Sequence, residues 1–120
     1  MASDIAKASA DHALLLQAID GERGPDQQRI ASEVLRWGGL MLRKNADYGG
    51  AVWDVPALAP DCSPSAAIRV RMSDKIARLR TLLAKGTAEV ADESIDDTLR
   101  DLGAYCLLEL CRPGRTEAGQ

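Results

Sequence analysis

Apolar residues recur at spacings of three and four along most of the chain, which is the period of an α-helix with one buried face. The pattern predicts four helices, at about residues 3–19, 25–44, 64–85 and 92–111. Their ends carry the expected signals. Ser63 followed by Pro64 is typical of a helix cap and first turn, and Gly86 is typical of a helix end. The sequence therefore predicts an all-α protein.

Each of the last three predicted helices carries an apolar stripe, which we expect to be buried. Two adjacent glycines, Gly38 and Gly39, interrupt the second helix, where they indicate either close contact with another helix or a kink. The stripes are Ile30, Val34, Trp37 and Met41 in the second helix, Ile68, Met72, Ile76, Leu79 and Leu83 in the third, and Ile95, Leu99, Leu102, Cys106 and Leu110 in the fourth.

A long irregular loop is predicted between the second and third helices, at about residues 45–63. Structureless loops of this length are unusual in small domains and are often functional. The segment KNADYGGAVWDV, residues 44–55, contains Tyr48 and Trp53, although the chain has only two Trp and two Tyr residues and no Phe. Two interpretations stay open. The rings offer flat faces on which a nucleobase could stack, or they close the end of a helical bundle.

The composition narrows the class of protein. A length of 120 residues favours one domain, and 46% hydrophobic residues with only 3% aromatic ones suit packed helices. We expect a domain over residues 1–112 and a frayed tail over residues 113–120. A net charge of −3 argues against binding of duplex nucleic acid.

The cysteine pattern and the sequence of the N-terminus narrow the class of protein further. Three cysteines and one histidine form no zinc-binding pattern, and Cys106 and Cys111 are interpreted as small core residues. Neither a signal peptide nor a membrane span is expected, so we expect a cytoplasmic protein.

Two charged stripes are candidates for chemistry. Glu93, Asp97 and Asp101 follow one another at four-residue spacing on the predicted fourth helix. Like charges at this spacing repel, and carboxylates that converge on a partly buried face are typical ligands of Mg²⁺. The alternative is a solvated acidic face.

The second charged stripe lies on the third helix and consists of Arg71, Asp74, Lys75 and Arg78. It is either a surface ladder of ion pairs or a set in which Asp74 faces a metal and the cations face phosphate oxygens. At the end of the second helix, Lys44, Asn45 and Asp47 add a cation, an amide and a carboxylate beside the two aromatic rings.

Three blocks in this order resemble one known family: KNADYGGAVW, IRVRMSDKIARLRTLLAKG and DESIDDTLRDLGAYCLLEL. The resemblance is to the nucleotide modification associated domain family of the first type, which is found widely in phages and bacteria. That family is similar to the all-α NTP pyrophosphohydrolases of the MazG and dimeric dUTPase type, which cleave between the α and β phosphates with Mg²⁺. The resemblance implies a four-helix bundle-like, MazG-type domain that forms a homodimer or higher homo-oligomer in a bacterial or phage-infected cytoplasm.

The chain departs from the pyrophosphohydrolase motifs. The usual E-x-x-E motif is missing, and Thr98 stands where the second motif normally has Glu. Asp74 could replace part of the first motif. The resemblance therefore supports a nucleotide site more strongly than it supports hydrolysis.

Three functions follow as expectations. The first is a Mg²⁺-dependent pyrophosphohydrolase acting on a nucleoside triphosphate or modified nucleotide. The second is a nucleotide-binding protein without catalysis, such as a phage sponge that sequesters a nucleotide second messenger, and the third is a structural helical domain. For the first, the expected metal ligands are Asp74, Glu93, Asp97 and Asp101, and the expected nucleotide-binding residues are Lys44, Asn45, Asp47, Tyr48, Trp53, Arg71, Lys75 and Arg78.

Overall fold

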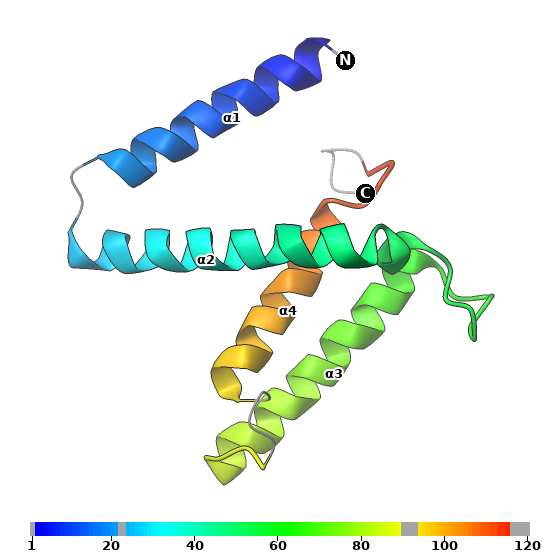
Figure 1. The fold of residues 1–120 in the computed structure, drawn as a ribbon. Coiled ribbons are helices and arrows are strands. Elements are labelled where there is room, and N and C mark those ends of the chain that lie inside the picture. Colours follow the sequence, from blue (N-terminus) through cyan, green and yellow to red (C-terminus); the bar gives the residue numbers. More distant parts are fainter. Residues whose placement is uncertain (1, 22–23, 90–93, 116–120) are drawn as a thin grey trace. The chain divides into compact units, whose positions relative to one another are not determined.

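A computed structural model describes residues 2–21, 24–89 and 94–115, all of which form helices or the turns between them (Figure 1). The described residues contain no strand, so the predicted all-α class is confirmed. The helices are α1 (Ala2–Asp20), α2 (Pro25–Tyr48), α3 (Pro64–Lys85) and α4 (Ile95–Leu110), with a short 3₁₀ helix, η1 (Ala51–Trp53), between α2 and α3.

The chain divides into two units, residues 1–42 and 43–120, and each is described by itself. The first unit contains α1 and most of α2. No described residue of α2 is buried, and Ile30 is 64% exposed, so the prediction of a buried stripe on this helix was wrong. The expectation of one domain over residues 1–112 stays a prediction. Within the described residues, no helix combines the length and apolar character that a bilayer span requires.

The second unit is built on a hairpin of α3 and α4, which run antiparallel and side by side (Figure 1). The predicted start of α3 is confirmed, because the Ser63 hydroxyl oxygen accepts a hydrogen bond from the Ala66 N–H at 3.1 Å. Its end is confirmed as well. Gly86 has a φ of 85° and its N–H donates to the Leu82 carbonyl at 2.7 Å.

The hairpin interior contains three fully packed side chains. Ile68 and Leu82 of α3 are 1% and 7% exposed, and Thr98 of α4 is 0% exposed. The Thr98 hydroxyl donates to the Ser94 carbonyl at 2.7 Å, which satisfies its polar atom inside the interface. A short, satisfied side chain at this position lets the two helices approach closely.

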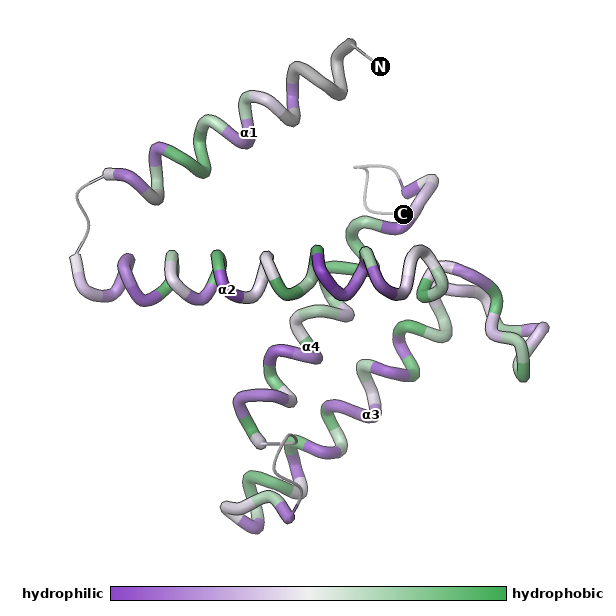
Figure 2. The backbone as a smooth tube through the Cα atoms, in the orientation of Figure 1, coloured by the Kyte–Doolittle hydropathy of each residue, from purple (hydrophilic) through white to green (hydrophobic). Residues whose placement is uncertain are grey.

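The surfaces of α3 and α4 that pack against each other are rotated about the helix axes relative to the predicted apolar stripes, so the predicted burial of these stripes was wrong in part. Ile76 and Leu83 of α3, and Leu99 and Leu110 of α4, are exposed rather than buried. Hydrophobic and hydrophilic residues alternate along much of α3 and along the first half of α4 (Figure 2), and a two-helix hairpin covers only one arc of each helix. That arc is centred on Ile68, Leu82 and Thr98, so part of each stripe is left uncovered.

The cysteine interpretation was also wrong. Cys106 and Cys111 are exposed, and Cys62 is half-buried. Cys106 belongs to the part of the α4 stripe that lies outside the arc facing α3. Cys111 follows the last residue of α4, and its N–H donates to the Leu107 carbonyl at 3.0 Å. The exposure of Cys106 therefore follows from the rotation of α4 about its own axis, and that of Cys111 from its position at the end of the helix.

Because only one surface of α3 packs against α4, truncating two apolar residues of α3 should change the free energy of unfolding by unequal amounts. Leu82→Ala removes a buried side chain and should lower the free energy of unfolding by about 2 to 4 kcal/mol. Val70→Ala should change it by less than about 1 kcal/mol, because Val70 is exposed and Ala has the higher helix propensity. Urea unfolding followed by circular dichroism measures both, and equal losses would contradict the observed face.

Candidate functional site

One side of the hairpin gathers charged side chains from both helices. With successive side chains about 100° apart, Lys75 falls between Ile68 and Leu82 on the arc of α3 that faces α4, and Arg71 and Arg78 lie on one flank of that arc. Asp97, Asp101 and Tyr105 lie on the corresponding flank of α4. Because the helices are antiparallel, these two flanks point to the same side of the hairpin. We call these six residues the charged face.

The charged face is held together by contacts between the helices. The Lys75 ammonium lies 3.1 Å from Oδ2 of Asp101, with the Lys75 side chain 17% exposed and the Asp101 side chain 40% exposed. One turn away, the Arg71 guanidinium carbon is 6.0 Å from the centre of the Tyr105 ring, at the outer limit of a cation–π contact. These contacts run across the hairpin, so the predicted ladder along α3 alone is not what organises Arg71 and Lys75.

Asp97 has a structural role that the sequence interpretation missed. It forms a capping box at the start of α4, in which Oδ2 accepts from the Ser94 hydroxyl at 2.7 Å and from the Ser94 N–H at 3.3 Å. In return, the Ser94 hydroxyl oxygen accepts from the Asp97 N–H at 3.1 Å. The signal was present as Ser-x-x-Asp, a variant of the usual Ser-x-x-Glu box.

The candidate metal ligands are only partly brought together. Asp97 and Asp101 are one turn apart on the charged face, whereas Asp74 is exposed on α3 and Glu93 lies outside the described residues. Within the described part of the chain, no three His, Cys, Asp or Glu side chains form a group of the kind that holds a metal ion. Mg²⁺ commonly uses one or two carboxylates together with phosphate oxygens, and Asp97 and Asp101 fit that smaller requirement.

The end of α2 explains part of the KNADYGG segment. The helix continues about one turn beyond the predicted end, to Tyr48. The Asn45 side-chain amide donates to the Gly49 carbonyl at 2.9 Å, and the Gly49 N–H donates to the Asn45 carbonyl at 2.7 Å. Gly49 has a φ of 63°, a conformation that favours glycine. Asn45 and Gly49 therefore form the helix end, and Lys44, Asp47 and Tyr48 are exposed beside it.

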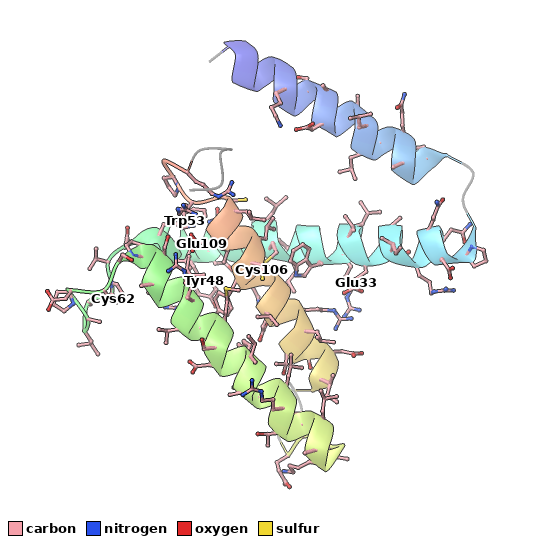
Figure 3. The ribbon with its side chains drawn as sticks, turned by 180° about the vertical axis from the view of Figure 1, so that it is seen from behind. Glu33, Tyr48, Trp53, Cys62, Cys106 and Glu109 are labelled. Atoms are coloured by element: carbon pink, nitrogen blue, oxygen red, sulfur yellow. The ribbon has the colours of Figure 1, made fainter. Side chains whose placement is uncertain are left out.

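Trp53 is fixed against the hairpin. Its indole N–H donates to the Leu108 carbonyl near the end of α4 at 2.9 Å, and its side chain is half-buried. Figure 3 shows Trp53 beside Glu109, where α3 begins and α4 ends. Of the two interpretations left open by the sequence, these contacts favour packing for Trp53, while Tyr48 is 74% exposed.

A cavity of about 270 Å³ lies next to the Trp53 ring. Its walls are mainly apolar, and its polar side chains come from the start of α3 and from the residues that follow α4. The lining residues are Trp53, Ser63, Pro64, Ser65, Ile68, Arg112 and Pro113.

Two of the lining residues are connected through the half-buried carboxylate of Glu109, which the sequence interpretation did not identify. The Ser65 hydroxyl donates to Oε1 of Glu109 at 2.7 Å, and Nη1 of Arg112 donates to the same oxygen at 2.6 Å. The other oxygen, Oε2, is buried without a hydrogen-bond partner among the described residues. No sequence signal links Ser65 to Glu109, because 44 residues separate them and only the antiparallel pairing brings them together.

The fold and these contacts define an all-α protein whose polar site lies on a helical hairpin. The model of the family described as nucleotide modification associated domain 1 matches residues 44–112, which include the end of α2, the Trp53 segment and the whole hairpin. The chain belongs to this family. No curated protein and no solved structure matches it. The more distant similarity to MazG-type pyrophosphohydrolases is not shown by these comparisons and stays a prediction.

The Trp53 contacts predict the fluorescence of the protein without any ligand. In Trp37→Phe, Trp53 is the sole tryptophan, and its emission should be blue-shifted relative to the same variant in concentrated urea, because the ring is half-buried against α3 and α4. Acrylamide should also quench it less efficiently than in urea. Emission identical to that of the unfolded chain would mean that the ring is not held on the hairpin.

Proposed function

We propose that the charged face binds the phosphates of a nucleotide. The observation that carries this proposal is that Arg71, Lys75 and Arg78 lie toward one side of the α3–α4 hairpin, within the segment that matches a nucleotide-associated family. Guanidinium and ammonium groups are the usual partners of phosphate oxygens in proteins. The exposed Lys44 at the end of α2 adds a further cation in the same unit.

The charges already paired on this face favour a nucleotide that carries Mg²⁺. A phosphate alone would have to displace Asp101 from Lys75 and would leave a carboxylate without its partner. A magnesium–nucleotide complex carries both signs, so the phosphates would take the cations while Asp97 and Asp101 held the metal. Each ion pair that is broken would then be replaced by another, which lowers the cost of binding.

The base has two candidate positions. The first is the cavity beside Trp53, which is lined by Ile68, and Ile68 lies about one helical turn before Arg71 in α3. The cavity volume of about 270 Å³ is large enough for a nucleobase-sized ring. Tyr48 is exposed on the last turn of α2 and could stack on the ring, with Asn45 and Asp47 close to it in sequence.

Hydrolysis and sequestration are the two outcomes that binding allows. The four-residue spacing of Asp97 and Asp101 favours hydrolysis, because two carboxylates one turn apart could hold Mg²⁺. The bound Mg²⁺ would polarise the phosphate groups at the bond between the α and β phosphates, which pyrophosphohydrolases cleave. The engagement of Asp97 in the α4 cap and of Asp101 with Lys75 favours sequestration without turnover. In both cases we place the activity in the cytoplasm of a bacterium or a phage-infected cell.

The phosphate role predicts a selective loss of binding. Lys75→Gln and Arg71→Gln should each weaken the affinity for the best nucleotide of a panel by at least about tenfold, which corresponds to one charge-assisted hydrogen bond. Arg69→Gln is the matched control, since Arg69 is an exposed cation of α3 outside the charged face. Isothermal titration calorimetry with Mg²⁺ measures all three, and equal losses would contradict a phosphate site on this face.

A second measurement separates hydrolysis from sequestration. The protein is incubated with the nucleotide panel and Mg²⁺, and both released pyrophosphate and recovered nucleotide are quantified. Turnover that Asp101→Asn abolishes, with its fold retained, supports the pyrophosphohydrolase. Tight recovery of unaltered nucleotide supports sequestration, and Mg²⁺ should then raise the melting temperature only together with the nucleotide. No binding to any nucleotide would leave the structural helical domain as the remaining interpretation.

A further inference from the structure

The cavity beside Trp53 has one polar corner. Ser65 and Arg112 line it, and both donate a hydrogen bond to the same carboxylate oxygen, Oε1 of Glu109, at 2.7 and 2.6 Å. The carboxylate of Glu109 therefore lies directly behind this part of the cavity wall. The residues that line the cavity all belong to the second unit of the chain, so the cavity is defined without reference to residues 1–42.

The carboxylate of Glu109 is satisfied at one oxygen only. Its second oxygen, Oε2, is buried and accepts no hydrogen bond among the described residues. An ionised carboxylate offers about four acceptor sites, of which Ser65 and Arg112 use two, both on Oε1. A buried acceptor without a donor carries the full cost of its lost hydration. A ligand that donates a hydrogen bond to Oε2 would recover this cost.

A small turn of the Glu109 carboxylate makes Oε2 accessible from the cavity. The last torsion of a glutamate side chain is broad and roughly two-fold, so the carboxylate turns about its Cγ–Cδ bond at small cost. Oε1 contacts two residues of the cavity wall, and a half turn would exchange the two oxygens. A partial turn therefore brings Oε2 to the wall while Arg112 keeps its ion pair with Glu109.

The Trp53 ring supplies a flat apolar wall to the same cavity. Its indole N–H donates to the Leu108 carbonyl at 2.9 Å, which holds the ring in one orientation. A fixed aromatic ring beside a cavity of about 270 Å³ suits an aromatic ligand that stacks on it. Figure 3 shows Trp53 and Glu109 close together, so one planar ligand can contact both.

We propose that this cavity selects nucleobases that carry an exocyclic amino group, with the base stacked on Trp53 and the amino group donating to Oε2 of Glu109. This inference rests on the proposed nucleotide function and adds the class of base. Adenine, cytosine and guanine have such a group. Uracil and thymine have a carbonyl oxygen in place of the amino group of cytosine, and hypoxanthine lacks the amino group of guanine. These bases would leave Oε2 without a donor, and a carbonyl oxygen would also be repelled by the carboxylate.

The donors beside Glu109 complete the match to these bases. In adenine, cytosine and guanine, the carbon atom that carries the amino group is bonded to a ring nitrogen that accepts hydrogen bonds. The Ser65 hydroxyl and the Arg112 guanidinium are donors at the same corner of the cavity. The corner therefore offers an acceptor for the amino group and donors for the neighbouring ring nitrogen.

Affinities for matched pairs of nucleotides test the inference. The pairs are cytidine against uridine triphosphate and guanosine against inosine triphosphate, as α,β-methylene analogues that cannot be cleaved between the α and β phosphates. In calorimetric titrations with Mg²⁺, the amino-bearing member of each pair should bind at least about tenfold more tightly, as expected for one hydrogen bond to a charged group. Equal affinities within both pairs would overturn the inference, while the phosphate site on the charged face would still stand.

Glu109→Gln separates recognition of the base from stability of the fold. Glutamine keeps a carbonyl oxygen for Ser65 and Arg112 and replaces Oε2 by an amide that donates, so the preference should fall below about twofold or reverse. Glu89→Gln is the matched control, because Glu89 is an exposed carboxylate of the same unit outside the cavity, and it should leave the preference unchanged. Circular dichroism checks the fold of both variants. An unchanged preference in folded Glu109→Gln would overturn the role of Glu109.

Nucleosides test the cavity independently of the phosphate site. In Trp37→Phe, cytidine should quench the emission of Trp53 at lower concentrations than uridine, because stacking places the base against the ring. This order of quenching would support the cavity even if no nucleotide bound to the charged face. Absence of quenching by both nucleosides at their highest soluble concentrations would overturn the inference.

Discussion

The close packing of α3 against α4 is the constraint on which the other features of this protein depend. Ile68, Leu82 and Thr98 fill the contact, and the Thr98 hydroxyl is satisfied by the Ser94 carbonyl within its own helix. Once this arc is fixed, the rotation of both helices is fixed as well. Lys75 then meets Asp101, and Arg71 approaches Tyr105, while the rest of the apolar stripe is left on the opposite side.

The predicted elements and their ends follow from local signals that the structure retains. Ser63, Pro64 and Gly86 act within one turn of the chain, and their effects on the backbone do not depend on distant residues. The residues of α3 and α4 that are buried between the helices were predicted incorrectly, because each apolar stripe is wider than the surface that the other helix covers. The periodicity of a sequence locates the centre of its apolar stripe. The part of the stripe that is buried depends on how the other helix packs against it. A buried threonine and the half-buried stem of Lys75 shift the buried part in this protein.

The candidate site likewise combines features that depend on one helix with features that depend on the packing of two. The cations of α3 and the carboxylates of α4 could be recognised from their spacing, because each set lies on one helix. Their pairing across the hairpin, and the connection of Ser65 with Glu109 and Arg112, depend on the register between helices, which no local pattern encodes. Asp97 shows the opposite error. Its local role as a capping residue was readable from Ser94, three positions earlier, but the four-residue spacing of the acids drew attention to metal binding instead.

The position of Thr98 sets a limit on the chemistry of the charged face. By the similarity to MazG-type pyrophosphohydrolases that the sequence predicts, this position would carry Glu, but here it is a threonine enclosed between α3 and α4 with no exposed surface. A carboxylate at the same place would be desolvated between the two helices, at a cost of several kcal/mol unless it were paired. The packing of α3 against α4 and an acid of the hydrolase motif therefore exclude each other at this residue. In the proposed site, a metal would be held from the flank of the hairpin by Asp97 and Asp101, whose carboxylates already contact Ser94 and Lys75. A nucleotide at the proposed site would have to exchange with these contacts, so the strength of the Lys75–Asp101 ion pair would limit the affinity for the nucleotide.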